Sequence, residues 1–148
     1  MNELNGYDIE DLEVGMSASF SKTITEADII LFAGASGDNN AVHINEVFAK
    51  TTPFGGRIAH GMLTASTISA AVANRLPGPG TIYVSQQLNF RGPVRPGDTV
   101  DATVTVKQIL PERGRAVLTT VCTVDGRVVV DGEAVVKATS RLRREGSV

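Results

Sequence analysis

Two residues that could move protons, Asp38 and His43, lie five positions apart in the segment Ser-Gly-Asp-Asn-Asn-Ala-Val-His at 36–43. A carboxylate and an imidazole that face one water molecule suit general acid–base chemistry, because one group accepts a proton while the other orients the water or returns the proton. Residues i and i+5 do not share a face of a regular helix, so a loop that turns back after Gly37 must bring them together. In the alternative interpretation, Asp38 caps the following turn and His43 is a surface or supporting residue, because short motifs often occur without the function.

A second group of candidate residues occurs in Arg-Ile-Ala-His-Gly-Met at 57–62, where a helix is predicted to begin. The first N–H groups of a helix lack intrahelical partners and carry partial positive charge, so the N–H of Gly61 could bind a developing oxyanion. Gly61 could equally serve helix-to-sheet packing. His60 is interpreted as a packed histidine bonded to the backbone, since His43 already supplies a proton-transfer group. Ser66 could reach the same site or bond back to a carbonyl of the preceding turn.

Other kinds of chemistry are disfavoured by the motifs that the sequence lacks. Ser66 is not within a G-x-S-x-G motif, which argues against a hydrolase nucleophile. Neither a dinucleotide-binding glycine motif nor a P-loop is found. With only two histidines and one cysteine, the chain offers few metal ligands, so neither a metal nor an organic cofactor is expected. Cys122 alternates within a predicted strand and is expected to be a small core residue.

Helical patterns flank the first motif. Thr25 precedes the acidic turn of Glu26 and Asp28 and is predicted to cap a helix that ends near Gly37. A loop is predicted from residue 38 to residue 56, with a short helix at 45–50. The segment from 58 to 75 is long, aliphatic and rich in Ala and Ser, which predicts a helix surrounded by other structure on nearly every side. The Pro-Gly-Pro-Gly run at 77–80 ends this helix.

Strand patterns dominate the remaining sequence, at 16–21, 82–90, 100–107, 116–124 and 128–138. Asp125-Gly126 predicts a hairpin turn, and Asp131-Gly132 predicts a bulge. The predicted fold class is therefore α+β, with a bent antiparallel sheet wrapped around one long apolar central helix. Residues 141–145 are expected to form a solvated end.

Length and charge set further bounds. The 148 residues suit a single domain, with a core at about 10–140 and a short polar C-terminal tail. The 14 basic and 16 acidic residues nearly balance, which disfavours nucleic-acid and membrane-surface binding. The acidic N-terminal segment does not have the pattern of a secretory signal, and no apolar run approaches the ~18 residues of a membrane span. With its single cysteine, the chain is expected in the reducing cytoplasm.

Several segments together resemble one enzyme family. The stretch Phe-Ala-Gly-Ala-Ser-Gly-Asp-Asn-Asn-Ala-Val-His at 32–43 is similar to the hydratase motif of the MaoC-like (R)-specific enoyl-CoA hydratases. Ile-Ala-His-Gly-Met-Leu at 58–63 resembles the segment that opens their central helix. The similarity continues through segments at 80–83, 88–90, 94–98 and 132–134, and it covers the chain from about 10 to 138.

The resemblance implies a hot-dog fold and a homodimer, or a dimer of such dimers, whose sheets join edge to edge. It also implies reversible addition of water to a trans-2-enoyl-CoA, giving the (R)-3-hydroxyacyl-CoA. By analogy Asp38 and His43 act on one water, the Gly61 N–H binds the thioester oxygen, and Ser66 supports the geometry of the pair. One departure is Ala41, where the family usually has proline, and this should loosen the loop without removing a reacting group.

Two other functions stay open at this level. A hot-dog thioesterase would use an acidic residue on a water that attacks the carbonyl itself. An acyl-thioester-binding dehydratase subunit would have no use for the pair of Asp38 and His43. The sequence distinguishes neither acyl-CoA from acyl-carrier-protein substrates nor one acyl chain length from another.

Overall fold

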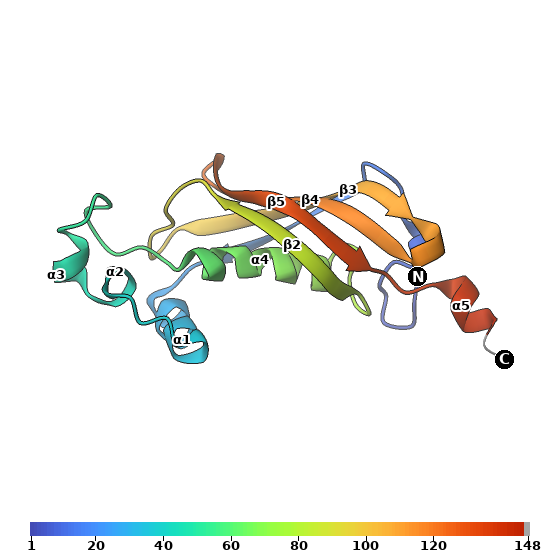
Figure 1. Ribbon diagram of the computed structural model, residues 1–148, viewed down its shortest axis with the longest axis horizontal. Helices are drawn as coiled ribbons and strands as arrows, with labels where there is room; N and C mark the ends of the chain where they lie inside the picture. The colour runs from blue at the N-terminus through green and yellow to red at the C-terminus, as the bar shows by residue number, and fades with distance from the viewer. Residues whose placement is uncertain (147–148) are drawn as a thin grey trace.

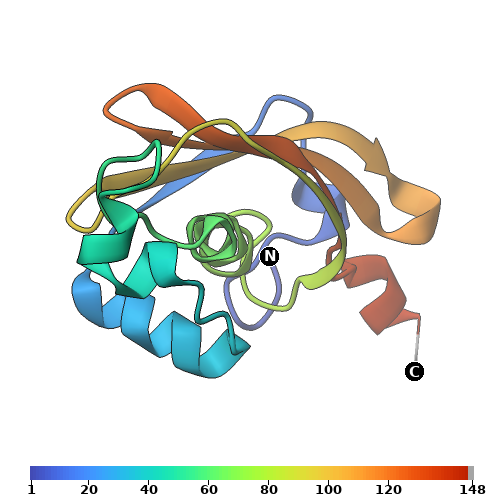
Figure 2. The ribbon, with the colours of Figure 1, turned by 60° about the vertical axis from the view of Figure 1, so that its left-hand side comes forward.

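The computed structural model describes residues 1–146, and a five-stranded antiparallel sheet forms its framework. The strands are β1 (Ser17–Thr23), β2 (Ile82–Phe90), β3 (Thr99–Leu110), β4 (Arg115–Val124) and β5 (Arg127–Lys137). They are ordered β1-β3-β4-β5-β2, so β1 and β2 are the two edges. The sheet curves around helix α4 (Gly61–Asn74), which Figure 2 shows nearly end-on beneath the arch. The predicted α+β layout is confirmed.

Helix α4 buries one side against the sheet. Its buried residues are Thr64, Ala65, Thr67, Ile68, Ala71 and Val72. The opposite side carries an exposed stripe at helical spacing, made of Met62, Ser66, Ser69 and Ala73. The expectation of a helix enclosed on nearly every side is therefore wrong for one protomer.

The helix also begins at residue 61 rather than 58, because the preceding segment is held extended by tertiary hydrogen bonds. The N–H of Ala59 donates to the carbonyl of Val94 at 2.7 Å, and the N–H of Ile58 donates to the carbonyl of Val42 at 3.3 Å. These bonds withdraw the segment from helical pairing and bring it beside the loop that follows β2.

Helix α1 (Glu26–Ser36) has the predicted limits. The Thr25 hydroxyl accepts the N–H of Asp28 at 3.1 Å, and the Asp28 carboxylate accepts the N–H of Thr25 at 2.8 Å, which is a reciprocal capping box. Gly37 ends the helix in the left-handed conformation, with φ of 79°. Two short helices follow, α2 (Ala41–Ile44) and α3 (Glu46–Ala49). Helix α3 was predicted, whereas α2 lies within the predicted loop. All three lie together near the N-terminal end of α4 (Figure 1).

The hairpin between β4 and β5 turns at Asp125-Gly126, as predicted, with positive φ at both residues. The predicted bulge at Asp131-Gly132 is wrong, because both residues pair regularly with β4 and β2. The extra residue is Val129, whose carbonyl accepts the N–H groups of Arg91 and Gly92 at 2.8 and 3.2 Å. Gly132 serves close packing instead, since a Cβ there would lie 1.8 Å from the carbonyl oxygen of Gln87.

The C-terminal segment is mostly exposed, as expected, but it is ordered and bonded to the rest of the fold. It forms helix α5 (Arg141–Glu145), which binds the N-terminal arm through Asp8. The Asp8 side chain is fully buried and accepts two hydrogen bonds from Arg144, at 2.7 and 2.9 Å. Hydrogen bonds from Arg144 and Thr139, with the charge of Arg144, lower the pKa of Asp8 despite its burial.

A short element η1 (Ile9–Asp11) follows Asp8, and a similar turn η2 (Pro111–Arg113) joins β3 to β4. Among residues 1–146, no helix is long and apolar enough to cross a membrane.

Candidate active site

Three helices bring Asp38, His43 and His60 together. Asp38 follows the left-handed cap of α1, His43 lies on α2, and His60 is the residue that precedes α4. One potential ligand atom from each of these side chains lies within 4.8 Å of the other two. The loop that turns back after Gly37 therefore produces the juxtaposition expected of Asp38 and His43, and it adds His60 to the group.

Asp38 is exposed and organises the turn that leads to α2. Its N–H donates to the Ser36 hydroxyl at 3.1 Å, and its Oδ1 accepts the N–H of Asn40 at 3.2 Å. Asn40 in turn caps α2 by accepting the N–H of Val42 at 3.2 Å. Asp38 therefore caps the turn, as the alternative interpretation of the sequence expected, while its second carboxylate oxygen stays available for another group.

The His43 side chain is only 8% exposed, and its orientation is fixed by the backbone. Its Nδ1 lies 2.8 Å from the carbonyl oxygen of Ile58. A carbonyl oxygen can only accept a hydrogen bond, so Nδ1 carries the proton and Nε2 of the neutral ring has a free lone pair. His43 is therefore held in the tautomer that a general base at Nε2 requires.

His60 is 1% exposed and is bonded to the backbone, as expected. Its Nε2 lies 2.9 Å from the carbonyl oxygen of Asp38. Its ring stacks on that of His43 with a centroid distance of 3.9 Å and an interplanar angle of 29°. Phe32 contacts it as well, with ring centroids 4.8 Å apart. Its Nδ1 is buried and has no hydrogen-bond partner within the described chain.

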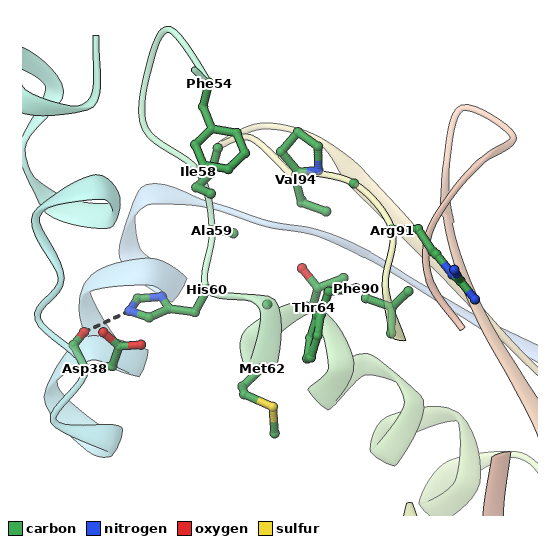
Figure 3. A pocket seen from close by; sticks show the side chains of 14 residues that line it. Asp38, Phe54, Ile58, Ala59, His60, Met62, Thr64, Phe90, Arg91 and Val94 are labelled. Carbon is green, nitrogen blue, oxygen red and sulfur yellow. Dashed lines mark hydrogen bonds between the residues drawn. The ribbon is translucent and has the colours of Figure 1, made fainter. Parts of the chain in front are cut away.

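A cavity of about 600 Å³ opens beside this group, between the segment that leads into α4 and the loop after β2. Figure 3 shows Asp38 and His60 on one side of it, with Phe90 and Val94 across from them. Its lining is mostly apolar, which suits a ligand with a hydrocarbon part.

Gly61 lies at this cavity as the first residue of α4, so its N–H has no partner within the helix. The ring of Phe90 approaches it so closely that a Cβ at Gly61 would lie 2.8 Å from two ring carbons. The absence of a side chain therefore permits the close packing, as one interpretation of Gly61 expected, and the oxyanion role of its N–H stays a prediction.

Ser66 is not brought to this group within one protomer. Its hydroxyl donates to the carbonyl of Leu63 at 2.5 Å, on the exposed side of α4, and it does not line the cavity. Cys122 is a fully buried core residue, as predicted, and burial raises the pKa of its thiol. Within the described residues it is the one cysteine, so no cysteine faces the cavity.

The site predicted from the sequence left out several residues of the cavity wall. Thr64 lies one turn after Gly61, and this helical spacing was a signal that could have identified it. Phe90 and Phe54 line the cavity from distant segments, and only the folded sheet brings them together. Arg91, also at the cavity, has an ion pair with Asp131 at 3.2 Å.

The same trio of side chains includes donor types that bind transition metals. Each imidazole has one nitrogen engaged by a carbonyl, which leaves one nitrogen per ring together with the carboxylate of Asp38. The free nitrogen of His60, Nδ1, is buried without a partner in the described chain, whereas Asp38 is exposed. The expectation that this site works without a metal stays a prediction from the sequence.

Comparison with known proteins places this site in a family context. The family model described as "MaoC like domain" matches residues 11–132. An (R)-specific enoyl-CoA hydratase from Rhodospirillum rubrum is 57% identical over 132 residues, which is 89% of this chain and 92% of the relative. A 3-hydroxybutyryl-CoA dehydratase from Methylorubrum extorquens is 53% identical, covering 91% of this chain and 86% of the relative.

Solved structures agree with these sequence relatives. An R-hydratase from Pseudomonas aeruginosa superposes with a TM-score of 0.87 at 44% identity, covering 92% of this chain and 88% of that one. The predicted hot-dog architecture and the predicted family are confirmed. The chain therefore belongs to the MaoC-like domain family.

Proposed function

We propose that this protein is an (R)-specific enoyl-CoA hydratase, which adds water reversibly to a trans-2-enoyl-CoA. The observation that carries the proposal is that Asp38 and Gly61, the first residue of α4, line one cavity, while His43 lies beside Asp38 within 4.8 Å. The names of the similar proteins support the same reaction class, because those relatives are hydratases and dehydratases of acyl-CoA thioesters.

The first step requires a water molecule held as a nucleophile. The free Nε2 of His43 and the free carboxylate oxygen of Asp38 are both acceptors, so together they can orient both protons of one water. As the oxygen attacks C3 of the enoyl thioester, one of the two groups takes its proton. A proton is then delivered to C2, either by the other group or by the group that took the proton from water. The product thus gains one hydroxyl and one hydrogen.

The second requirement is stabilisation of the negative charge that develops on the thioester oxygen when C3 is attacked. The Gly61 N–H lies at the N-terminus of a 14-residue helix, where the helix dipole adds partial positive charge. We propose that this N–H binds the thioester oxygen. The apolar wall that includes Val94 and Phe90 would then contact the acyl chain.

We further infer that the working unit is a homodimer joined through β2. This strand is a sheet edge, and its exposed side chains include Ile82 at 59%, Val84 at 41% and Phe90 at 55% exposure. A nine-residue edge strand with exposed apolar side chains and unpaired backbone groups favours pairing with a second strand. The exposed stripe on α4 adds small side chains that a second copy could cover. Joining two such edges would produce one continuous sheet.

The reaction class is tested with crotonyl-CoA as substrate. The loss of the conjugated thioester is followed by absorbance, and the product is identified with an (R)-specific 3-hydroxyacyl-CoA dehydrogenase. Release of free thiol from butyryl-CoA is measured in parallel. The proposal expects hydration with the (R) product and negligible thiol release. Thiol release without hydration would instead support a thioesterase. The absence of both reactions would support a binding subunit.

A further inference from the structure

We propose that His60 is a positioning residue, which holds the backbone of Asp38 and the ring of His43 in place relative to the N-terminus of α4. This inference rests on the proposed hydratase function, because it assigns Asp38, His43 and Gly61 to the reaction. His60 itself is not assigned a proton-transfer step.

The first contact is a hydrogen bond across 22 residues of sequence. His60 Nε2–H donates to the carbonyl oxygen of Asp38 at 2.9 Å, so the main chain that carries the reactive carboxylate is tied to the start of α4. The Asp38 side chain has a single hydrogen bond of its own, with the N–H of Asn40. The turn is exposed and its other hydrogen bonds are local in sequence, so the His60 bond is what links it to the start of α4.

The second contact is the stack between two imidazoles. The His43 ring is anchored at one nitrogen by Ile58, and its face rests against His60 at a centroid distance of 3.9 Å. Phe32 packs against His60 in turn, with centroids 4.8 Å apart. His60 therefore limits the rotation of His43 that its single hydrogen bond would otherwise allow.

His60 is also linked covalently to the proposed oxyanion donor, because it directly precedes Gly61. Its carbonyl accepts the N–H groups of Leu63 and Thr64 at 3.0 and 3.2 Å, which begins the helix. One residue thus connects the carboxylate, the imidazole and the proposed oxyanion donor, whose mutual placement decides the rate of a reaction among them.

The buried Nδ1 of His60 indicates that the ring does more than fill space. In the neutral ring Nε2 carries the proton, and Nδ1 is left buried with no partner in the described part of the chain. An unpartnered buried polar atom lowers the stability of the fold, so a phenyl ring would fill the same volume with a smaller loss of stability. What the imidazole adds over a phenyl ring is the donor to Asp38.

A matched pair of variants separates the donor from the volume of the side chain. His60→Gln and His60→Met have similar length and volume, and only glutamine can donate to the Asp38 carbonyl. His60→Phe is a second apolar variant that keeps an aromatic ring. Thr67→Val serves as a control, because Thr67 is a buried polar residue of α4 whose hydroxyl bonds only to Thr64 and Cys122, away from the cavity.

For each variant kcat and KM with crotonyl-CoA are measured across pH, together with the Tm. The proposal expects kcat to fall about 10- to 100-fold in the Met and Phe variants, because misplacement of reacting groups lowers the rate by such factors. It expects KM to change less than about 3-fold, and His60→Gln to recover most of kcat. Thr67→Val is expected to retain wild-type kcat and pH dependence, whatever its Tm.

Equal kcat in folded Gln and Met variants would overturn the proposal. So would failure of both apolar variants to fold while His60→Gln folds, because the donor would then serve folding rather than positioning. Failure of the hydratase assignment looks different, since the wild-type protein itself would not hydrate crotonyl-CoA.

Discussion

The Nδ1 atom of His43 lies 2.8 Å from the carbonyl oxygen of Ile58, the residue that begins the extended segment leading into α4. This contact fixes the tautomer of His43 and leaves Nε2 as the free nitrogen. The bond links the helix that carries His43 to the segment that carries His60 and Gly61. The chemistry proposed for the site depends on that link, because it sets which nitrogen meets the water.

Gly61→Ala is expected to reduce hydration at least 10-fold while the fold persists. The new methyl group would lie 2.8 Å from the Phe90 ring, so the ring must move at the point where the thioester oxygen is proposed to bind. Steady-state kinetics with crotonyl-CoA and circular dichroism check this. Gly34→Ala is the matched control, since its Cβ would meet nothing within 4 Å on an exposed turn of α1. Wild-type kinetics in Gly61→Ala would exclude the proposed oxyanion role.

Ala41→Pro is expected to raise the free energy of unfolding by about 0.5 to 1 kcal/mol, because proline restricts the unfolded chain. Ala41 is the first residue of α2, where proline is favoured, and Asn40 before it already has the extended ψ of 130° that proline requires. Urea denaturation measures the change. A loss of stability in this variant would show that the departure from the family pattern is a requirement of this chain.

Asp8→Asn is expected to reduce the free energy of unfolding by roughly 1.5 to 3 kcal/mol at pH 7, because it removes the buried carboxylate that accepts hydrogen bonds from Arg144 and Thr139. The pKa of folded Asp8 is lowered below its unfolded value of 3.8, so its stabilising effect is complete above about pH 4 and declines as pH falls. Denaturation of both proteins from pH 7 to pH 2.5 should therefore show a gap that narrows below about pH 4.

Glu133→Gln is the control for that measurement. Its ion pair with Lys107 is short, at 2.6 Å, but both side chains are about half exposed. Such pairs contribute about 1 kcal/mol or less. A loss in Asp8→Asn no larger than in this control would contradict a structural role for the contact between α5 and the N-terminal arm.

Val84→Lys is expected to convert a dimer into monomers. The side chain is 41% exposed on edge strand β2, and two lysines brought together across paired edges would repel each other. Sedimentation velocity of the wild type and the variant measures the change. Gln108→Lys, at an exposed position on β3 away from the edges, adds the same charge and serves as the control. A wild-type protein that sediments as a monomer would refute the interface.

The parts of the fold that could be predicted from the sequence are those set by local signals. Thr25 and Gly37 define α1 because a cap and a left-handed residue act within a few residues of the chain. The strands were predicted from the alternation of apolar and polar residues, which is also a local signal. Gly132 was misinterpreted as a bulge because its packing partner, Gln87, is 45 residues away in the sequence. The start of α4 was placed three residues early, because the carbonyls that hold the preceding segment extended belong to Val42 and Val94, which are distant in the sequence.

The candidate site likewise has a part that could be predicted from the sequence and a part that could not. Residue types and spacing identified Asp38 and His43, and the resemblance assigned their roles. The stack of His60 on His43 and its bond to the Asp38 carbonyl could not be predicted, because they join segments that meet only in the folded chain. Ser66 was expected at the site from the resemblance, yet in one protomer its hydroxyl bonds to its own helix.

The most direct test of the proposed mechanism is the kcat of crotonyl-CoA hydration in Asp38→Asn and His43→Gln, compared with Asp125→Asn as a control. Asp125 lies in the hairpin turn, where asparagine tolerates the same positive φ of 49°. Each site variant should lose about 100-fold or more in kcat with little change in Tm, while the control stays within about 2-fold of wild type. Wild-type turnover in both site variants would contradict the assignment of Asp38 and His43 to the reacting water.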